Sequence, residues 1–128
     1  MHDKIKILVG YDASQQSKNA LNEAIAIAKA FSGSLKVVNV YPRGLKEKAE
    51  TSVIEVIETL KKEKVNYDIE LIQNSNPAKT LETTAKKENY DLIVIGSRGL
   101  GNTMSMVLGS VSRHIVINAH TNVMVVKT

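Results

Sequence analysis

The chain has 128 residues, a formal net charge of +4 and no cysteine. This length suits one domain with a core of its own, and the absence of cysteine excludes disulfides, thiolate zinc sites and thiol catalysis. Lysines are interspersed with glutamates and only 4% of the residues are aromatic, which argues against nucleic-acid binding and indicates a solvated surface of mixed charge. The first apolar run, residues 7–9, is too short for a secretory or membrane-spanning segment, so we expect a cytoplasmic protein without a membrane partner.

A strand, a helix and a second strand are predicted in the first part of the chain. Residues 5–10 become fully apolar toward their end, as a central parallel strand covered on both faces does. Ser14 suits the N-cap of a helix that runs to about Phe31, and Gly33 stands where a left-handed C-terminal residue is expected. Residues 35–41 form the second strand, which a proline ends.

Two further helices and two strands follow. Residues 46–64 have apolar side chains on one side and lysine and glutamate on the other, as in a helix that packs on a sheet. Residues 67–73 alternate between apolar and polar side chains, which is the pattern of a half-exposed or edge strand. Pro77 suits the first turn of a helix that extends to about Glu88, and residues 92–95 form a near-continuous apolar strand.

The last part of the chain contains a glycine-rich loop, a short helix and a strand. Gly109 and Ser110 open a segment with helical periodicity that continues to about Asn118, and residues 122–127 form the last strand. Five strands that alternate with four helices favour parallel pairing with right-handed crossovers. The sequence therefore predicts an α/β fold in which residues 1–128 form a single doubly wound domain, with three layers around a five-stranded parallel sheet.

The loop that begins at Gly96 follows a buried strand and precedes a helix, an arrangement that suits an anion such as phosphate. Glycine allows main-chain N–H groups to approach a ligand, and a helix N-terminus supplies donors and the positive end of a dipole. Two common phosphate motifs are excluded, because the chain has no Gly-Lys pair and Met104 stands where a dinucleotide fingerprint needs its third glycine. A loop whose glycines only make turns is the alternative.

The spacing Gly96-x2-Gly99-x9-Gly109-Ser110 resembles the nucleotide-binding signature of the universal stress protein family, in its ATP-binding branch. Four stretches carry the resemblance beyond this spacing: residues 7–14, 91–99, 109–112 and 123–126. The resemblance covers essentially the whole chain. It implies the strand order 3-2-1-4-5, an adenine-nucleotide alpha-hydrolase-like fold, and a ligand held between the ends of the first and fourth strands, where the strand order reverses.

The resemblance also implies roles by position. In the ATP-binding members an acidic residue after the first strand contacts the adenosine end or helps to hold a metal, the end of the second strand binds adenine through its backbone, and the glycine loop with the following helix start holds ribose and phosphates. Carried over, these residues are Asp12, Val40, Gly96, Gly99, Gly109, Ser110 and Val111. Arg98 is a further candidate, because its planar guanidinium suits phosphate, with a solvated surface position as the alternative. For Asp12 an Asx turn or a helix cap is the alternative.

The implied cofactor is ATP, and any metal would be Mg²⁺ or Mn²⁺ brought by its phosphates. No other metal site is expected, because His2, His114 and His120 have no metal-ligand spacing. The last strand would lie at a sheet edge, and its apolar residues 123–126 favour pairing with a second copy. A homodimer through this edge is also what the resemblance implies.

Three hypotheses for the function follow. The first is a small cytoplasmic ATP-binding regulatory protein of the stress response, in which nucleotide occupancy or slow turnover alters partner interactions. The second is an ATP-hydrolysing or nucleotidyl-transfer enzyme of related fold; because the chain has no His-x-Gly-His or Ser-Gly-Gly-x-Asp-Ser motif, we assign no catalytic residue and expect at most slow ATP hydrolysis. The third is a nucleotide-free dimeric interaction module, which loss of the glycine–serine spacing would have favoured.

Overall fold

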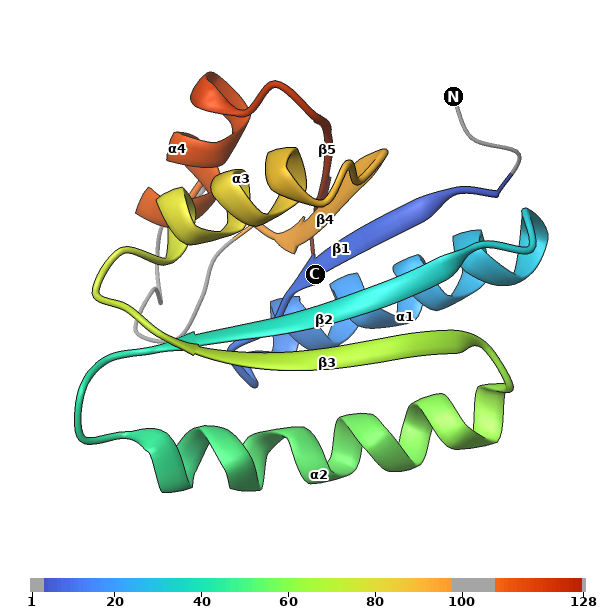
Figure 1. The fold of residues 1–128 in the computed structure, drawn as a ribbon, viewed down its shortest axis with the longest axis horizontal. Helices are drawn as coiled ribbons and strands as arrows, with labels where there is room; N and C mark the ends of the chain where they lie inside the picture. Colours follow the sequence, from blue (N-terminus) through green and yellow to red (C-terminus); the bar gives the residue numbers. More distant parts are fainter. Residues whose placement is uncertain (1–3, 98–107, 128) are drawn as a thin grey trace.

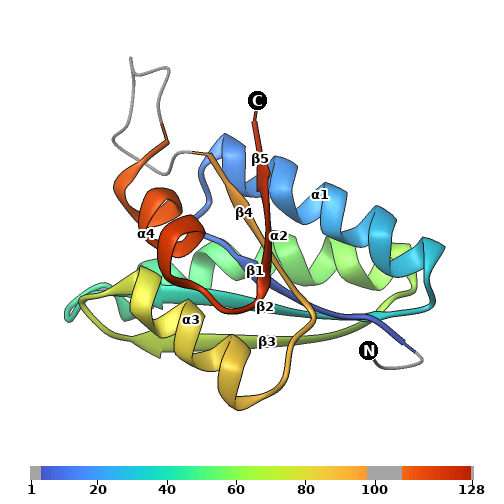
Figure 2. The same ribbon diagram turned by 90° about the horizontal axis from the view of Figure 1, so that it is seen from above.

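The computed structural model describes residues 4–97 and 108–127. The strands are β1 (Lys6–Gly10), β2 (Ser34–Tyr41), β3 (Asn66–Gln73), β4 (Leu92–Gly96) and β5 (Asn122–Val126). The helices are α1 (Gln15–Ala30), α2 (Lys46–Glu63), α3 (Pro77–Lys87) and α4 (Ser110–Asn118). The strands form one parallel sheet in the order β3-β2-β1-β4-β5, with α1 and α2 on one face and α3 and α4 on the other (Figures 1 and 2). The predicted doubly wound, three-layer fold and its strand order are confirmed.

Two apolar cores, one on each face of the sheet, hold the layers together. Side chains alternate along β1, so that Ile7 and Val9 contribute to the core under α1 and α2, whereas Leu8 contributes to the core under α3 and α4. All three side chains are completely buried. The continuous apolar run near the N-terminus is therefore explained by a central strand that pairs with β2 on one side and β4 on the other.

The helix ends agree with the predicted positions except at the end of α1. Ser14 is the N-cap of α1, and the Asn76 side chain caps α3 immediately before Pro77. The left-handed residue after α1 is Ser32, with φ of 52°, and not Gly33 as predicted. A Cβ atom at Gly33 would collide with the Ile5 carbonyl oxygen, so glycine is required there for close passage of the chain before β1.

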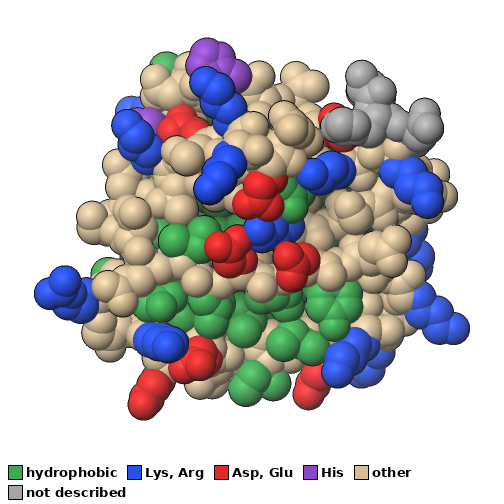
Figure 3. Space-filling view, in the orientation of Figure 1, with side chains coloured by type: hydrophobic (Ala, Val, Ile, Leu, Met, Phe, Trp, Pro, Cys, Tyr) green, Lys and Arg blue, Asp and Glu red, His purple; other side chains and the backbone are tan. Residues whose placement is uncertain are grey.

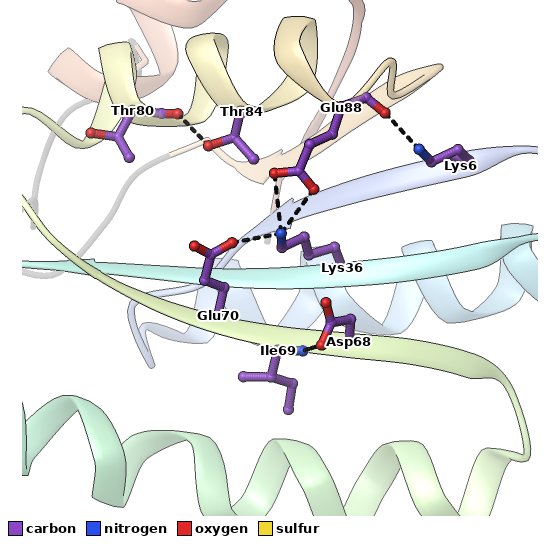
Figure 4. Close-up of polar contacts among 8 residues, drawn as sticks. All are labelled: Lys6, Lys36, Asp68, Ile69, Glu70, Thr80, Thr84 and Glu88. Atoms are coloured by element: carbon purple, nitrogen blue, oxygen red, sulfur yellow. Dashed lines mark hydrogen bonds and ion pairs between the residues drawn. The ribbon is translucent and has the colours of Figure 1, made fainter.

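A cluster of charged side chains lies on the α3 face of the sheet, at the edge of the apolar core. Lys36 of β2 is 7% exposed, and its Nζ forms ion pairs with Glu70 of β3 and, at 2.9 Å, with Glu88 at the end of α3 (Figure 4). Lys6 Nζ donates a hydrogen bond to the Glu88 carbonyl oxygen. Burial alone would lower the pKa of Lys36, but the bonds to Glu70 and Glu88 outweigh it and raise that pKa. In the space-filling view, acidic and basic side chains lie together here, above an apolar band next to α2 (Figure 3).

The outer strands of the sheet are β3 and β5. Residues alternate in exposure over the first half of β3, as the pattern of an edge strand predicted. No helix in residues 4–97 or 108–127 has the length and hydropathy needed to cross a bilayer.

Candidate functional site

A cavity of about 210 Å³ lies at the carboxyl ends of β1 and β4. Helix α1, which follows β1, lies on one face of the sheet, and α4, which follows β4, lies on the other (Figure 2). The strand order therefore reverses between β1 and β4, which is where ligands bind in open α/β sheets. Its apolar wall comes from β2, α3 and β4, with Val38, Val40, Pro77, Leu81 and Ile95. Its polar lining comes from the two strand–helix junctions, with Asp12, Ser14, Ser17, Ser110 and Ser112.

Six of the candidate residues line this one cavity, although they lie far apart in the sequence. They are Asp12, Val40, Gly96, Gly109, Ser110 and Val111. The other two candidates, Arg98 and Gly99, lie outside the described residues. The fold thus brings the end of β2, the turn after β1 and the start of α4 to the same crevice.

The turn after β1 is held by a local network of hydrogen bonds. Asp12 Oδ1 accepts from the Ser14 N–H at 3.0 Å, which is the Asx turn that the sequence left open as the alternative role of Asp12. Ser14 Oγ accepts from the Ser17 N–H at 3.1 Å and caps α1. Ser17 Oγ donates to the Ser14 carbonyl oxygen and accepts from the Asp12 N–H. The Asp12 side chain is therefore oriented by the turn while the residue remains exposed at the cavity.

The junction between β4 and α4 is held by bonds that cross the loop. The Ser97 N–H donates to the Val126 carbonyl oxygen at 2.9 Å, and the Ser97 carbonyl oxygen accepts from the Gly109 N–H at 2.8 Å. Ser112 Oγ donates to the Gly96 carbonyl oxygen at 2.6 Å. The start of α4 is thereby placed directly beside the end of β4.

Among residues 4–97 and 108–127, no side chain caps the N-terminus of α4. Its N-cap is Gly109, which makes no side-chain hydrogen bond, and its first turn contains no acidic residue. The following residues, Ser110 and Val111, line the cavity. Because the first N–H groups of a helix have no acceptor within the helix and lie at the positive end of its dipole, this end of the cavity favours an anion.

The opposite wall of the cavity presents the backbone of β2. The Val38 carbonyl oxygen accepts from the Tyr11 N–H at 3.0 Å, so the main-chain polar groups of Val38 point toward β1. Those of Val40, two residues further along the strand, point the same way. The register of β1 ends with Gly10 opposite Val38, so no residue of β1 stands opposite Val40.

Several cavity residues were not predicted from the sequence. Tyr11 is 5% exposed, and burial, together with the charges of Glu55 and Asp12, raises the pKa of its hydroxyl. Ser17 and Ser112 are both 4% exposed, and each stands three residues after the N-cap of its helix. Serine at that spacing is the available signal, but it does not separate a buried hydroxyl from an exposed one.

The chemistry of the described lining is that of a binding site. Asp12 is its one carboxylate, and the described lining includes no histidine, lysine or arginine. Among residues 4–97 and 108–127, no three histidine, aspartate or glutamate side chains gather in a way that could hold a metal ion. An apolar wall with open main-chain groups at one end and helix N–H groups at the other suits a flat heterocycle joined to an anion.

Comparison with known proteins gives the same family over nearly the whole chain. Residues 5–127 match the model of the universal stress protein family. A relative from Thermus aquaticus, the universal stress protein in the QAH/OAS sulfhydrylase 3′ region, is 32% identical, with 94% of this chain and 97% of the relative covered. Universal stress protein MJ0531 of Methanocaldococcus jannaschii is 34% identical, with coverages of 95% and 81%.

Solved structures share the fold at lower identity. Hypothetical protein MJ0577 superimposes with a TM-score of 0.89 at 21% identity, over 99% of this chain and 98% of that one. A universal stress protein in complex with cAMP gives 0.82 at 24% identity, with coverages of 98% and 98%. The Archaeoglobus fulgidus universal stress protein in complex with dAMP gives 0.79 at 21% identity, with coverages of 98% and 100%. With a matching family model and relatives above 30% identity, the chain belongs to the universal stress protein family.

Proposed function

We propose that this protein binds an adenine nucleotide, ATP, in the cavity between the ends of β1 and β4, and that nucleotide occupancy regulates its interactions with partners in a stress response. The observation that carries the proposal is the pairing of open backbone groups at Val40 with the uncapped N-terminus of α4 across one cavity. Two structural neighbours that were solved with cAMP and dAMP support an adenine nucleotide as the ligand.

The base lies against the apolar wall in this proposal. Adenine offers a ring nitrogen that accepts and an amino group that donates, and the Val40 N–H and carbonyl oxygen are the complementary pair. Val38, Leu81 and Ile95 supply apolar contacts for the ring faces. Recognition through backbone groups requires no particular side chain at position 40, in agreement with a valine there.

The phosphates lie at the start of α4. The N–H groups of Ser110 and Val111 and the Ser110 hydroxyl are the donors at that end, and Gly109 leaves the N-cap position free of a competing side chain. Each contact of a charge with a helix N-terminus contributes about 0.3–1 kcal/mol when exposed, so several are needed for useful affinity. Arg98 and Gly99 remain candidates for the same end.

Asp12 faces the cavity from the turn after β1. Its carboxylate suits the hydroxyls of the adenosine end, or a Mg²⁺ or Mn²⁺ ion that arrives with the phosphates. The Asx turn is compatible with this role, because it engages Oδ1 with the Ser14 N–H and thereby orients the carboxylate. The residues present therefore fit a nucleotide with its metal, which would supply charge neutralisation at the phosphates.

The proposed assembly is a homodimer through β5. This strand pairs with β4 along one edge and is the last strand of the sheet, and Met124 on it is 37% exposed. An apolar edge strand is a template for pairing with another strand. A second copy would extend the sheet and remove the open edge.

The central claim is tested by the nucleotide content of the protein. Purified protein is denatured and any released nucleotide is identified by chromatography, and stripped protein is then titrated with ATP by calorimetry. The Gly109→Val, Ser110→Val double variant should lose binding, whereas Lys46→Val, at the first position of α2 and outside the cavity lining, should retain it. Native protein that neither carries nor binds an adenine nucleotide would refute the proposal.

Product formation with added ATP separates regulation from catalysis. A regulatory protein should hydrolyse ATP slowly or not at all. Many turnovers per minute would favour an ATP-using enzyme instead.

A further inference from the structure

Ser112 ties the first turn of α4 to the end of β4. Its Oγ donates a hydrogen bond of 2.6 Å to the carbonyl oxygen of Gly96, across a separation of 16 residues in the chain. The residue is 4% exposed, so water competes little for this bond. The first turn of α4 cannot move along β4 without breaking it.

A second bond acts on the same turn from another position. The Gly109 N–H donates to the Ser97 carbonyl oxygen at 2.8 Å, and Gly109 is the N-cap of α4. Ser112 stands three residues later, which is most of one helical turn. Two bonds at these positions set both the place of the helix start and its rotation about the helix axis.

This rotation decides where the first N–H groups of α4 point. The geometry assigns Ser112 as a positioning residue, whose hydroxyl holds the N–H groups of Ser110 and Val111 toward the phosphate of a nucleotide with its base at Val40. The inference rests on the proposed function. Without the hydroxyl, the phosphate end of the site loosens, whereas the base end, made by β2, keeps its shape.

The effect of removing the hydroxyl should therefore depend on the phosphate of the ligand. Stripped wild-type protein and Ser112→Ala are titrated by calorimetry with adenosine, AMP and ATP. We expect Ser112→Ala to bind AMP and ATP about five- to tenfold more weakly and adenosine within about twofold of wild type. A residue that only stabilises the fold would weaken all three ligands alike.

Thr84→Val is the matched control. The Thr84 hydroxyl is also buried and donates to a carbonyl oxygen, that of Thr80, but Thr84 lies in α3 and is not part of the cavity lining. The Thr84→Val variant should have a lower free energy of unfolding than wild type and the same ratio of AMP affinity to adenosine affinity. If Ser112→Ala does not fold, Ser112→Cys replaces the hydroxyl with a thiol of similar shape and weaker donor strength, and the same change in ratio is expected.

The outcomes separate this inference from the proposed function. If wild type binds the ligands and Ser112→Ala has the same ratio of AMP affinity to adenosine affinity as wild type, the proposed function stands and the inference is overturned. An equal loss for adenosine and AMP also overturns it. Wild-type protein that binds none of the three ligands overturns the proposed function, and the inference with it.

Discussion

A Cβ atom at Gly96 would lie 2.7 Å from the Cβ atom of Gln16 and 2.8 Å from its carbonyl carbon. Gln16 is in the first turn of α1 and Gly96 ends β4, so the two residues mark the point where α1 passes over the sheet. The missing side chain at Gly96 therefore makes room for a helix. Gly96 also lines the cavity, but the approach of α1 is sufficient to explain a glycine at this position.

We predict that Gly96→Ala destabilises the protein by about 2 kcal/mol, because its new methyl group meets backbone atoms of Gln16. The matched variant is Gly10→Ala, whose nearest neighbour would be Leu81 Cδ1 at 2.9 Å, the far end of a flexible side chain. That variant should lose about 1 kcal/mol or less, since Leu81 can change its rotamer. Urea denaturation measures both. If Gly96→Ala lost less free energy of unfolding than Gly10→Ala, the close approach of α1 would not be the reason for a glycine at position 96.

The two roles of Asp12 are separable by substitution. Asp12→Asn keeps an oxygen that accepts the Ser14 N–H and removes the charge, whereas Asp12→Ala removes both. We expect the free energy of unfolding of the asparagine variant to lie within about 0.5 kcal/mol of the wild-type value, and that of the alanine variant to be lower by about 1 kcal/mol. Calorimetric affinity for ATP with Mg²⁺ should fall in both variants. If the asparagine variant bound ATP as tightly as wild type, the charge of Asp12 would have no role in binding, and the residue would serve only to form the turn.

The buried ammonium of Lys36 is expected to stabilise the α3 side of the sheet. Lys36→Met leaves Glu70 and Glu88 without their shared cation and should cost about 1–2 kcal/mol, less than a fully buried pair because both carboxylates are partly exposed. The control is Lys29→Met, which breaks the exposed pair with Glu63 and should change stability by at most about 0.5 kcal/mol. If Lys36→Met and Lys29→Met lowered the free energy of unfolding equally in urea denaturation, the buried ion pairs of Lys36 would stabilise the fold no more than an exposed pair.

The pH dependence of this contribution follows from the raised pKa of Lys36. A group whose pKa is higher in the folded state stabilises the fold fully below its unfolded value, which is 10.5 for lysine, and loses that contribution as the pH rises through the folded value. The difference in unfolding free energy between wild type and Lys36→Met should therefore stay constant between about pH 7 and 9 and shrink only above pH 10.5. A difference that shrinks already between about pH 7 and 9 would contradict the raised pKa.

The proposed dimer can be tested with a variant that keeps the hydrogen bonds between β4 and β5. The Val126 carbonyl oxygen accepts from the N–H of Ser97, the residue after β4, so the main-chain groups of Val126 and Met124 face β4, and those of Val125 face the open edge. Val125→Pro removes an N–H from that edge only and should shift the protein from dimer to monomer in sedimentation velocity. Met124→Pro, by contrast, removes a donor to β4 and should destabilise the fold. A dimer that persists in Val125→Pro would exclude this edge as the interface.

Most elements were predictable because their signals are local. The apolar runs of β1 and β4, the Ser14 cap and Pro77 at the start of α3 depend on neighbouring residues alone, and each lies within one or two residues of its predicted position. The wrong prediction of a left-handed conformation at Gly33 has a long-range cause. The group that excludes a side chain there belongs to Ile5, which precedes both β1 and α1 in the sequence. Local sequence gives no measure of such an approach.

The sequence by itself determined the alternation of strands and helices, the glycine–serine spacing and hence the family, because periodicity, caps and motif spacing are all properties of nearby residues. The tertiary structure decided which of these features meet. Parallel pairing ends β1 at Gly10, and Val40 of β2 is left beside the cavity as a result. Buried contacts that span the chain, from Ser112 to Gly96 and from α1 to Gly96, then set where α4 starts and how closely α1 lies over the sheet.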